Sequence, residues 1–133
     1  MKSVVVPYKN YKLNACPIIT IEVEGPKTRK NIDAYVDSGA SISIFSIQET
    51  IRLGINYQKG KEIFMTVGDG SSIPVYLHNL KVKIGAISFP ATIGFSARLG
   101  VGFNLIGRRD FFERFDITFS DSAQTISFLP VNK

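Results

Sequence analysis

Ala34-Tyr35-Val36-Asp37-Ser38-Gly39-Ala40 is the stretch of this sequence that decides the fold, and it occurs once in the chain. Three apolar residues lead directly into an acid, a small hydroxyl residue and a glycine, which predicts a carboxylate buried in a tight turn. Aspartate is rarely buried unless something compensates its charge, so such a turn indicates chemistry rather than packing. Because the motif has no second copy, Asp37 has no equivalent carboxylate within its own chain.

The length and composition indicate one globular domain. The chain has 133 residues, of which 44% are hydrophobic and 20% are charged, and such a composition is typical of a folded domain with a sizeable core. The formal net charge of +5 suggests nucleic acid as a partner. The basic residues are nevertheless scattered, with short clusters only at 27–30 and 108–109. We therefore expect solvated surface charges and no nucleic-acid partner.

The sequence also predicts the cellular location of the protein and whether it binds a metal or cofactor. Its single cysteine, Cys16, cannot form an internal disulfide, and residues 1–9 lack the apolar core of a secretory signal. The apolar stretch 84–106 contains Pro90, Arg98 and Asn104, which argue against a membrane span. We expect a cytoplasmic protein with no membrane partner. One histidine and one cysteine assemble neither a zinc site nor a cysteine–histidine pair, so we expect no metal and no cofactor.

Strand patterns dominate the chain. The clearest alternation lies at 17–24, where Ile19, Ile21 and Val23 share one face. A glycine–proline turn then returns the chain through 31–36, a second strand that ends on Asp37. Further strands are predicted at 41–45, 63–67, 72–76, 80–85, 87–93, 115–119 and 125–129.

Two short helices are predicted between these strands. Ser46 and Glu49 have the spacing of a capping box. In this motif the serine side chain accepts a hydrogen bond from the backbone amide of the glutamate, and the glutamate side chain accepts one from the backbone amide of the serine. This helix should end at Gly54, where glycine can take the left-handed conformation. A second short helix is predicted at 108–113.

With these residues laid out, the chain resembles the single-domain, retroviral-type (retropepsin-like) aspartic protease family. Asp37-Ser38-Gly39-Ala40 matches the catalytic turn of the family, and the 68–71 hairpin lies where the family carries its flap. Leu105-Ile106-Gly107 matches the apolar-apolar-glycine element that passes beside the catalytic turn, and a basic residue and a helix follow it. The resemblance covers roughly residues 17–129.

The resemblance implies a fold and a set of site residues. The expected fold is mainly β: a small closed β-barrel-like acid protease fold with one flap hairpin and one or two short helices. Residues 1–16 would be an N-terminal extension and 17–133 the protease domain. Asp37 would be the catalytic residue. The residues expected to support the site are Ser38, Gly39, Ala40, Leu105, Ile106 and Gly107, and the substrate-binding flap would contain Val67, Gly68, Asp69 and Gly70.

The resemblance further implies assembly and activity. A lone Asp37 needs the same residue from a second chain, so we expect a homodimer that cleaves peptides or unfolded proteins. The Ser38 hydroxyl would either reach the partner across the dimer axis or bond within its own turn. One departure is Ser41. Retroviral enzymes often carry an aspartate at this place, and it pairs with the arginine that follows the second glycine, which is Arg108 in this chain. The alternative function is a catalytically silent protein-binding module of the same fold.

Overall fold

The computed structural model describes residues 2–131, and most of them belong to strands. Twelve strands, one α-helix and two short helical turns, at 57–59 and 108–112, follow one another along this part of the chain. In chain order, the labelled elements are β1 (Val4–Pro7), β2 (Lys9–Tyr11), β3 (Asn14–Cys16), β4 (Ile18–Glu24), β5 (Arg29–Val36), β6 (Ser43–Ser46), α1 (Gln48–Leu53), β7 (Lys61–Thr66), β8 (Ser72–Ile84), β9 (Ile87–Ser96), β10 (Asn104–Ile106), β11 (Phe115–Ser120) and β12 (Thr125–Pro130).

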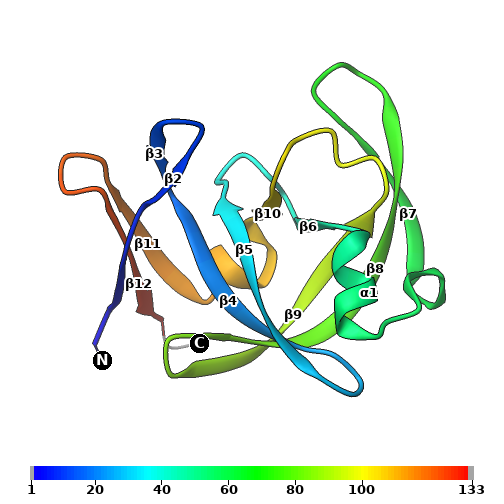
Figure 1. Cartoon of the computed structure of the whole chain (residues 1–133), viewed down its shortest axis with the longest axis horizontal. Coiled ribbons are helices and arrows are strands. Elements are labelled where there is room, and N and C mark those ends of the chain that lie inside the picture. Colours follow the sequence, from blue (N-terminus) through cyan, green and yellow to red (C-terminus); the bar gives the residue numbers. More distant parts are fainter. Residues whose placement is uncertain (1, 132–133) are drawn as a thin grey trace.

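The main sheet closes on itself. Its seven strands lie in the order β4-β5-β10-β6-β9-β8-β7, and β4 also pairs with β8, which joins the two sides of the sheet. Six strands thus form a ring, while β7 continues β8 outward as a hairpin (Figure 1). The predicted mainly β, barrel-like fold is confirmed.

The core follows from the predicted alternation. In β4, Ile19, Ile21 and Val23 are buried while Thr20 and Glu24 face solvent, as a strand with one covered face requires. β5 contributes its alternate residues to the same core. At the end of the barrel, four buried phenylalanines make edge-to-face contacts with centroid separations of 5.4–5.7 Å, a favoured aromatic geometry. They are Phe89, Phe111, Phe115 and Phe128.

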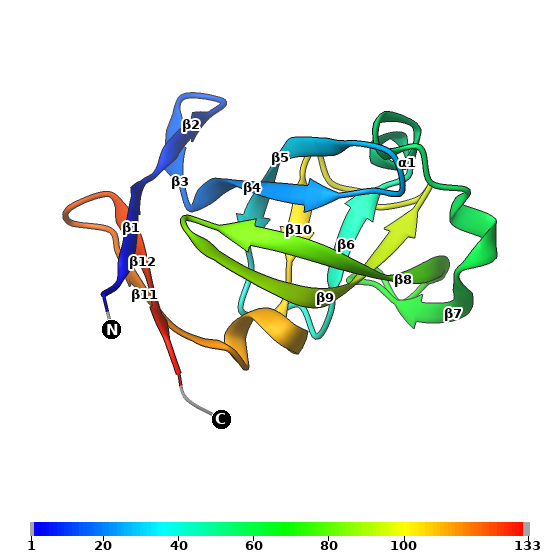
Figure 2. The ribbon, with the colours of Figure 1, turned by 90° about the horizontal axis from the view of Figure 1, so that it is seen from below.

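A separate sheet joins the two ends of the described chain. β1 pairs antiparallel with β12, which pairs with β11, and Val4 lies opposite Phe128. Figure 2 shows this sheet at one end of the molecule, beside the barrel. Between β1 and β4, the β2–β3 hairpin forms a small sheet of its own. The predicted boundary between an extension at 1–16 and a domain at 17–133 stays a prediction, and residues 1, 132 and 133 lie outside the described part.

Two predicted elements differ from the structure. The predicted strands at 72–76 and 80–85 form one long strand, β8, because its first half pairs with β7 and its second half with β9. The predicted helix at 108–113 is an irregular helical turn at 108–112, in which Asp110 has a φ of 69°. Asp110 accepts a hydrogen bond from the Thr92 amide (2.7 Å), which ties this turn to β9.

The predicted capping box at the start of α1 is also wrong. The helix begins at Gln48 without a side-chain cap, although Ser46 Oγ accepts a hydrogen bond from the Gln48 amide (3.2 Å). Glu49 does not turn back to Ser46, because its carboxylate accepts hydrogen bonds from Asn104 (2.9 Å) and Arg52 (2.7 Å). The helix ends as predicted at Gly54, which has a φ of 72°.

Candidate active site

The Asp37 carboxylate is held at the end of β5 by its own turn. The Asp37 amide donates to the Ile106 carbonyl (2.9 Å), which fixes the start of the turn against β10. The Gly39 amide donates to Asp37 Oδ1 (2.8 Å), and the Ala40 amide donates to the Asp37 carbonyl (3.2 Å). Asp37 is half-buried, while Ser38 and Gly39 are exposed. The single chain therefore buries Asp37 only in part, because β5 ends at Val36 and the turn that follows lies at the surface.

A backbone crossing at Gly107 ties this turn to its companion element. β10 lies between β5, to which it is parallel, and β6, to which it is antiparallel. The chain from 37 to 42 must therefore pass over the end of β10. A Cβ on Gly107 would overlap the Ile42 carbonyl group and lie 2.8 Å from the Ala40 oxygen. The Gly107 amide also donates to Ser43 Oγ (2.9 Å), so this position requires glycine for space.

Arg108 completes the support of the turn. Its guanidinium donates to the Ser38 carbonyl (3.0 Å) and lies over the Phe112 ring, 5.4 Å from the centroid. Its backbone amide donates to the Ala40 carbonyl (2.8 Å). The sequence offered no acidic partner for this arginine because Ser41 occupies the expected position. The partner is instead a main-chain oxygen of the turn itself.

The hairpin predicted at 68–71 is present between β7 and β8. Its turn is closed by hydrogen bonds from the Val67 amide to the Ser71 carbonyl and from the Gly70 amide to the Val67 carbonyl (both 2.9 Å). At the tip, Asp69 accepts hydrogen bonds from the Ser71 hydroxyl (2.6 Å) and amide (2.9 Å). These bonds, the hydroxyl first, lower the pKa of Asp69 below its usual 3.8. The ionised carboxylate therefore holds the turn in shape at neutral pH.

A cavity of about 670 Å³ separates the Asp37 turn from this hairpin. Both lie along the side of the molecule drawn uppermost in Figure 1, together with the loop between β9 and β10. Three charged side chains border the cavity, from Asp37, Asp69 and Arg98. Most of its other large side chains are apolar, namely Ile42, Ile44, Met65, Val67, Ile73, Leu99, Val101 and Leu105. Its size and lining suit an extended, largely apolar ligand.

The structure brings most of the predicted site residues to this cavity. The predicted residues that line it are Asp37, Gly39, Ala40, Leu105, Val67, Gly68 and Asp69. Ile106 and Gly107 are buried behind the turn and act on it through the backbone contacts above. Ser38 and Gly70 lie beside the lining, and the Ser38 carbonyl is bound by Arg108.

The sequence did not indicate the loop at 97–103 as part of the site. Arg98, Leu99, Gly100 and Val101 form one wall of the cavity. No sequence pattern predicts that a loop will line a cavity. The one feature that could have drawn attention to this loop is its glycine-containing sequence just before β10.

Among residues 2–131, no group of three or more histidine, cysteine, aspartate or glutamate side chains is arranged to hold a metal ion. Over the same residues, every helix is too short or too polar to cross a membrane.

Two solved structures with this architecture are aspartic proteases. A retropepsin-like aspartic protease from Rickettsia conorii superimposes with a TM-score of 0.70 at 18% identity, covering 96% of this chain and 89% of that one. EIAV protease, in complex with the inhibitor HBY-793, gives a TM-score of 0.55 at 16% identity, covering 75% of this chain and 88% of that one. The sequence itself matches no protein-family model and no curated protein. The chain therefore has the fold of the retropepsin-like aspartic proteases.

Proposed function

We propose that the chain is a homodimeric aspartic endopeptidase. The observation that carries this proposal is the position of Asp37. Its carboxylate is fixed by the Gly39 amide at the border of a cavity that a hairpin faces from the other side. The similarity in fold to aspartic proteases adds support.

The proposed chemistry needs two carboxylates. In aspartic proteases, two acids about 3 Å apart share one proton, because they cannot both ionise at that separation. The ionised carboxylate takes a proton from a bound water as the water oxygen attacks the carbonyl carbon of the peptide. The protonated carboxyl donates its hydrogen to the carbonyl oxygen, which gives a tetrahedral diol. As the carbon–nitrogen bond breaks, the acid that took the proton from water gives it to the leaving nitrogen, and one hydroxyl of the diol returns its proton to the other carboxylate. The protons belong to the pair of acids and not to either one alone. No cofactor is needed.

The second carboxylate is expected from Asp37 of the partner subunit. Within this chain, Asp121-Ser122-Ala123 resembles the motif superficially. It lies in the turn between β11 and β12, where Asp121 accepts a hydrogen bond from the Tyr8 hydroxyl (2.7 Å). The exposed Ser38–Gly39 turn can meet an identical turn across a twofold axis, since such an axis brings identical surfaces together.

The proposed substrate is an extended peptide or an unfolded protein segment. It would lie between the Asp37 turn and the flap hairpin as an added strand, with side-chain pockets that set the preference. The apolar lining favours apolar side chains next to the cleaved bond. The cytoplasmic location, and the exclusion of nucleic acid and membranes as partners, stay predictions from the sequence.

Activity should follow the fraction of dimer. We expect specific activity on a quenched fluorescent peptide to rise with protein concentration in step with the dimer fraction measured by analytical ultracentrifugation. The physical reason is that a monomer holds one carboxylate of the pair. Cleavage by a protein that remains monomeric would contradict the proposal. Peptide binding without cleavage at any concentration would support the silent binding module instead.

A further inference from the structure

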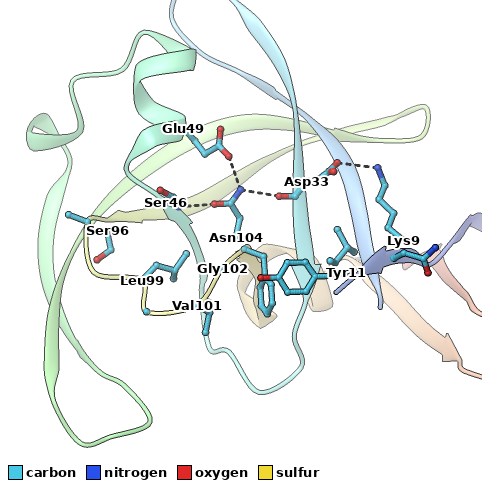
Figure 3. A pocket seen from close by; sticks show the side chains of 15 residues that line it. Lys9, Tyr11, Asp33, Ser46, Glu49, Ser96, Leu99, Val101, Gly102 and Asn104 are labelled. Carbon is cyan, nitrogen blue, oxygen red and sulfur yellow. Dashed lines mark hydrogen bonds and ion pairs between the residues drawn. The ribbon is translucent and has the colours of Figure 1, made fainter. Parts of the chain in front are cut away.

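The loop at 97–103 has a hollow on each side. On one side lies the cavity above Asp37, and on the other lies a second cavity of about 540 Å³ (Figure 3). Leu99, Gly100 and Val101 border both cavities. Gly100 has a φ of 82° and little packed around it, and Val101 is 48% exposed. The middle of the loop is therefore a thin wall with room to move in either direction.

Two contacts hold the ends of this wall. At its start, Leu99 packs against a small buried cluster beneath the flap strands, which includes Ile73 and Val75. At its end, Phe103 stacks on Tyr35 with centroids 4.9 Å apart and meets Tyr11 edge-on at 5.2 Å. Tyr35 lies two residues before Asp37, so these rings connect the wall to the strand that carries the candidate catalytic acid.

Tyr11 supports the wall from outside the cleft. It belongs to the β2–β3 hairpin and lines the second cavity but not the cavity above Asp37. Its hydroxyl lies against Gly102, where an added Cβ would overlap it. Figure 3 shows the Tyr11 ring beside Gly102. Tyr11 thus touches both the backbone of the loop and the ring of Phe103 that ends it.

The hairpin that carries Tyr11 is tightly built. Tyr11 pairs with Asn14 across a two-residue turn. The turn residues Lys12 and Leu13 have φ values of 49° and 70°, the left-handed conformation that two-residue hairpin turns require and that glycine or asparagine normally supplies. Lys12 and Leu13 take this conformation in the turn although their side chains make it costly. The backbone of Tyr11 is held by the pairing of β2 with β3.

We infer that Tyr11 is a positioning residue for peptide binding, which holds the 97–103 wall against the cleft through Gly102 and Phe103. This inference rests on the proposed function, because it assigns the wall to the same peptide site. Without the Tyr11 ring, the wall can shift into the second cavity and lose its contacts with substrate. The Asp37 turn keeps its own hydrogen bonds, so binding weakens while the chemical step is preserved.

The first measurement needs no activity. Backbone ¹⁵N relaxation of the free protein gives order parameters for residues 98–102, and rigid backbone has values of about 0.85. We expect Tyr11→Ala to lower them to below about 0.6, the range of flexible segments. Tyr11→Phe should lower them less, because it keeps the ring against Phe103 and loses only the hydroxyl against Gly102. The matched control is Tyr57→Ala, which removes another edge-to-face pair, with Tyr76, away from the wall. It should leave residues 98–102 as they are.

The second measurement concerns peptide binding. We expect Tyr11→Ala to raise KM, and the dissociation constant of a statine-containing peptide, about fivefold while kcat stays within twofold. Unchanged order parameters would overturn the positioning role, and a mobile wall with unchanged peptide affinity would overturn the link to binding. If the wild-type protein binds the statine peptide but cleaves nothing, the proposed function fails, and a weaker affinity of Tyr11→Ala for that peptide still supports the positioning role. If the wild-type protein neither binds nor cleaves, both fail.

Discussion

Asp37→Asn should abolish peptide hydrolysis, with a loss of at least about 10⁴-fold in kcat from removing both general acid–base groups of the dimer. An amide neither takes a proton from water nor donates one as a carboxyl group does. The fold should persist, because the asparagine side-chain oxygen can still accept the hydrogen bond that the Gly39 amide donates to Asp37 Oδ1. The measurement is the cleavage rate of a quenched peptide, alongside circular dichroism and sedimentation to check fold and assembly.

Asp121→Asn is the matched control for this substitution. Asp121 also precedes a serine in a turn, and an asparagine there can still accept the hydrogen bond from the Tyr8 hydroxyl. We expect this variant to cleave at close to the wild-type rate. Cleavage by Asp37→Asn at the wild-type rate, or equal losses in the two variants, would contradict the role of Asp37.

Gly107→Ala should have the second largest effect, on stability as well as activity. The added methyl group meets backbone atoms of Ile42 and Ala40, which cannot rotate away as a flexible side chain would. We expect a loss of about 3 kcal/mol in the free energy of unfolding, the upper part of the range for overpacked sites. The measurement is urea denaturation followed by circular dichroism, with peptide cleavage measured on the fraction that remains folded.

Gly68→Ala gives the comparison for that experiment. Nothing lies within 4 Å of a Cβ built at Gly68, and its φ is not positive. Its urea midpoint should therefore stay within the error of the wild-type value. Equal urea midpoints for Gly107→Ala and the wild type would contradict the close approach of the Ile42 and Ala40 backbone to Gly107.

The elements that the sequence predicted well are those with a local signal. The alternation of Ile19, Ile21 and Val23 identified β4 and its buried face. The Asp37-Ser38-Gly39 turn is indicated by its own residues, and the Leu105-Ile106-Gly107 element by the resemblance to the retropepsin-like family. The structure places the two in hydrogen-bonding contact through Asp37 and Ile106. Turn and strand chemistry of this kind acts over a few residues, so it can be predicted without the fold.

The features that the sequence did not predict depend on contacts between distant residues. Glu49 does not cap the helix, because its carboxylate accepts a hydrogen bond from Asn104, which lies 55 residues away in the chain. Arg108 donates a hydrogen bond to the Ser38 carbonyl. Every residue has a main-chain oxygen, so the sequence does not indicate which one the arginine will bind. The pairing of β1 with β12 joins opposite ends of the chain. The 97–103 wall has no pattern of its own, since its position is set by Tyr11 and Tyr35 from other strands.

In the proposed enzyme, two copies of Asp37 form one active site. The most direct test is a crystal structure of the protein with a statine-containing peptide, in which the distance between the two Asp37 carboxylates is measured. We expect the two carboxylates to lie about 3 Å apart across a twofold axis, with the statine hydroxyl bound to both. A peptide bound by a single Asp37, with the second carboxylate far from it, would contradict the claim.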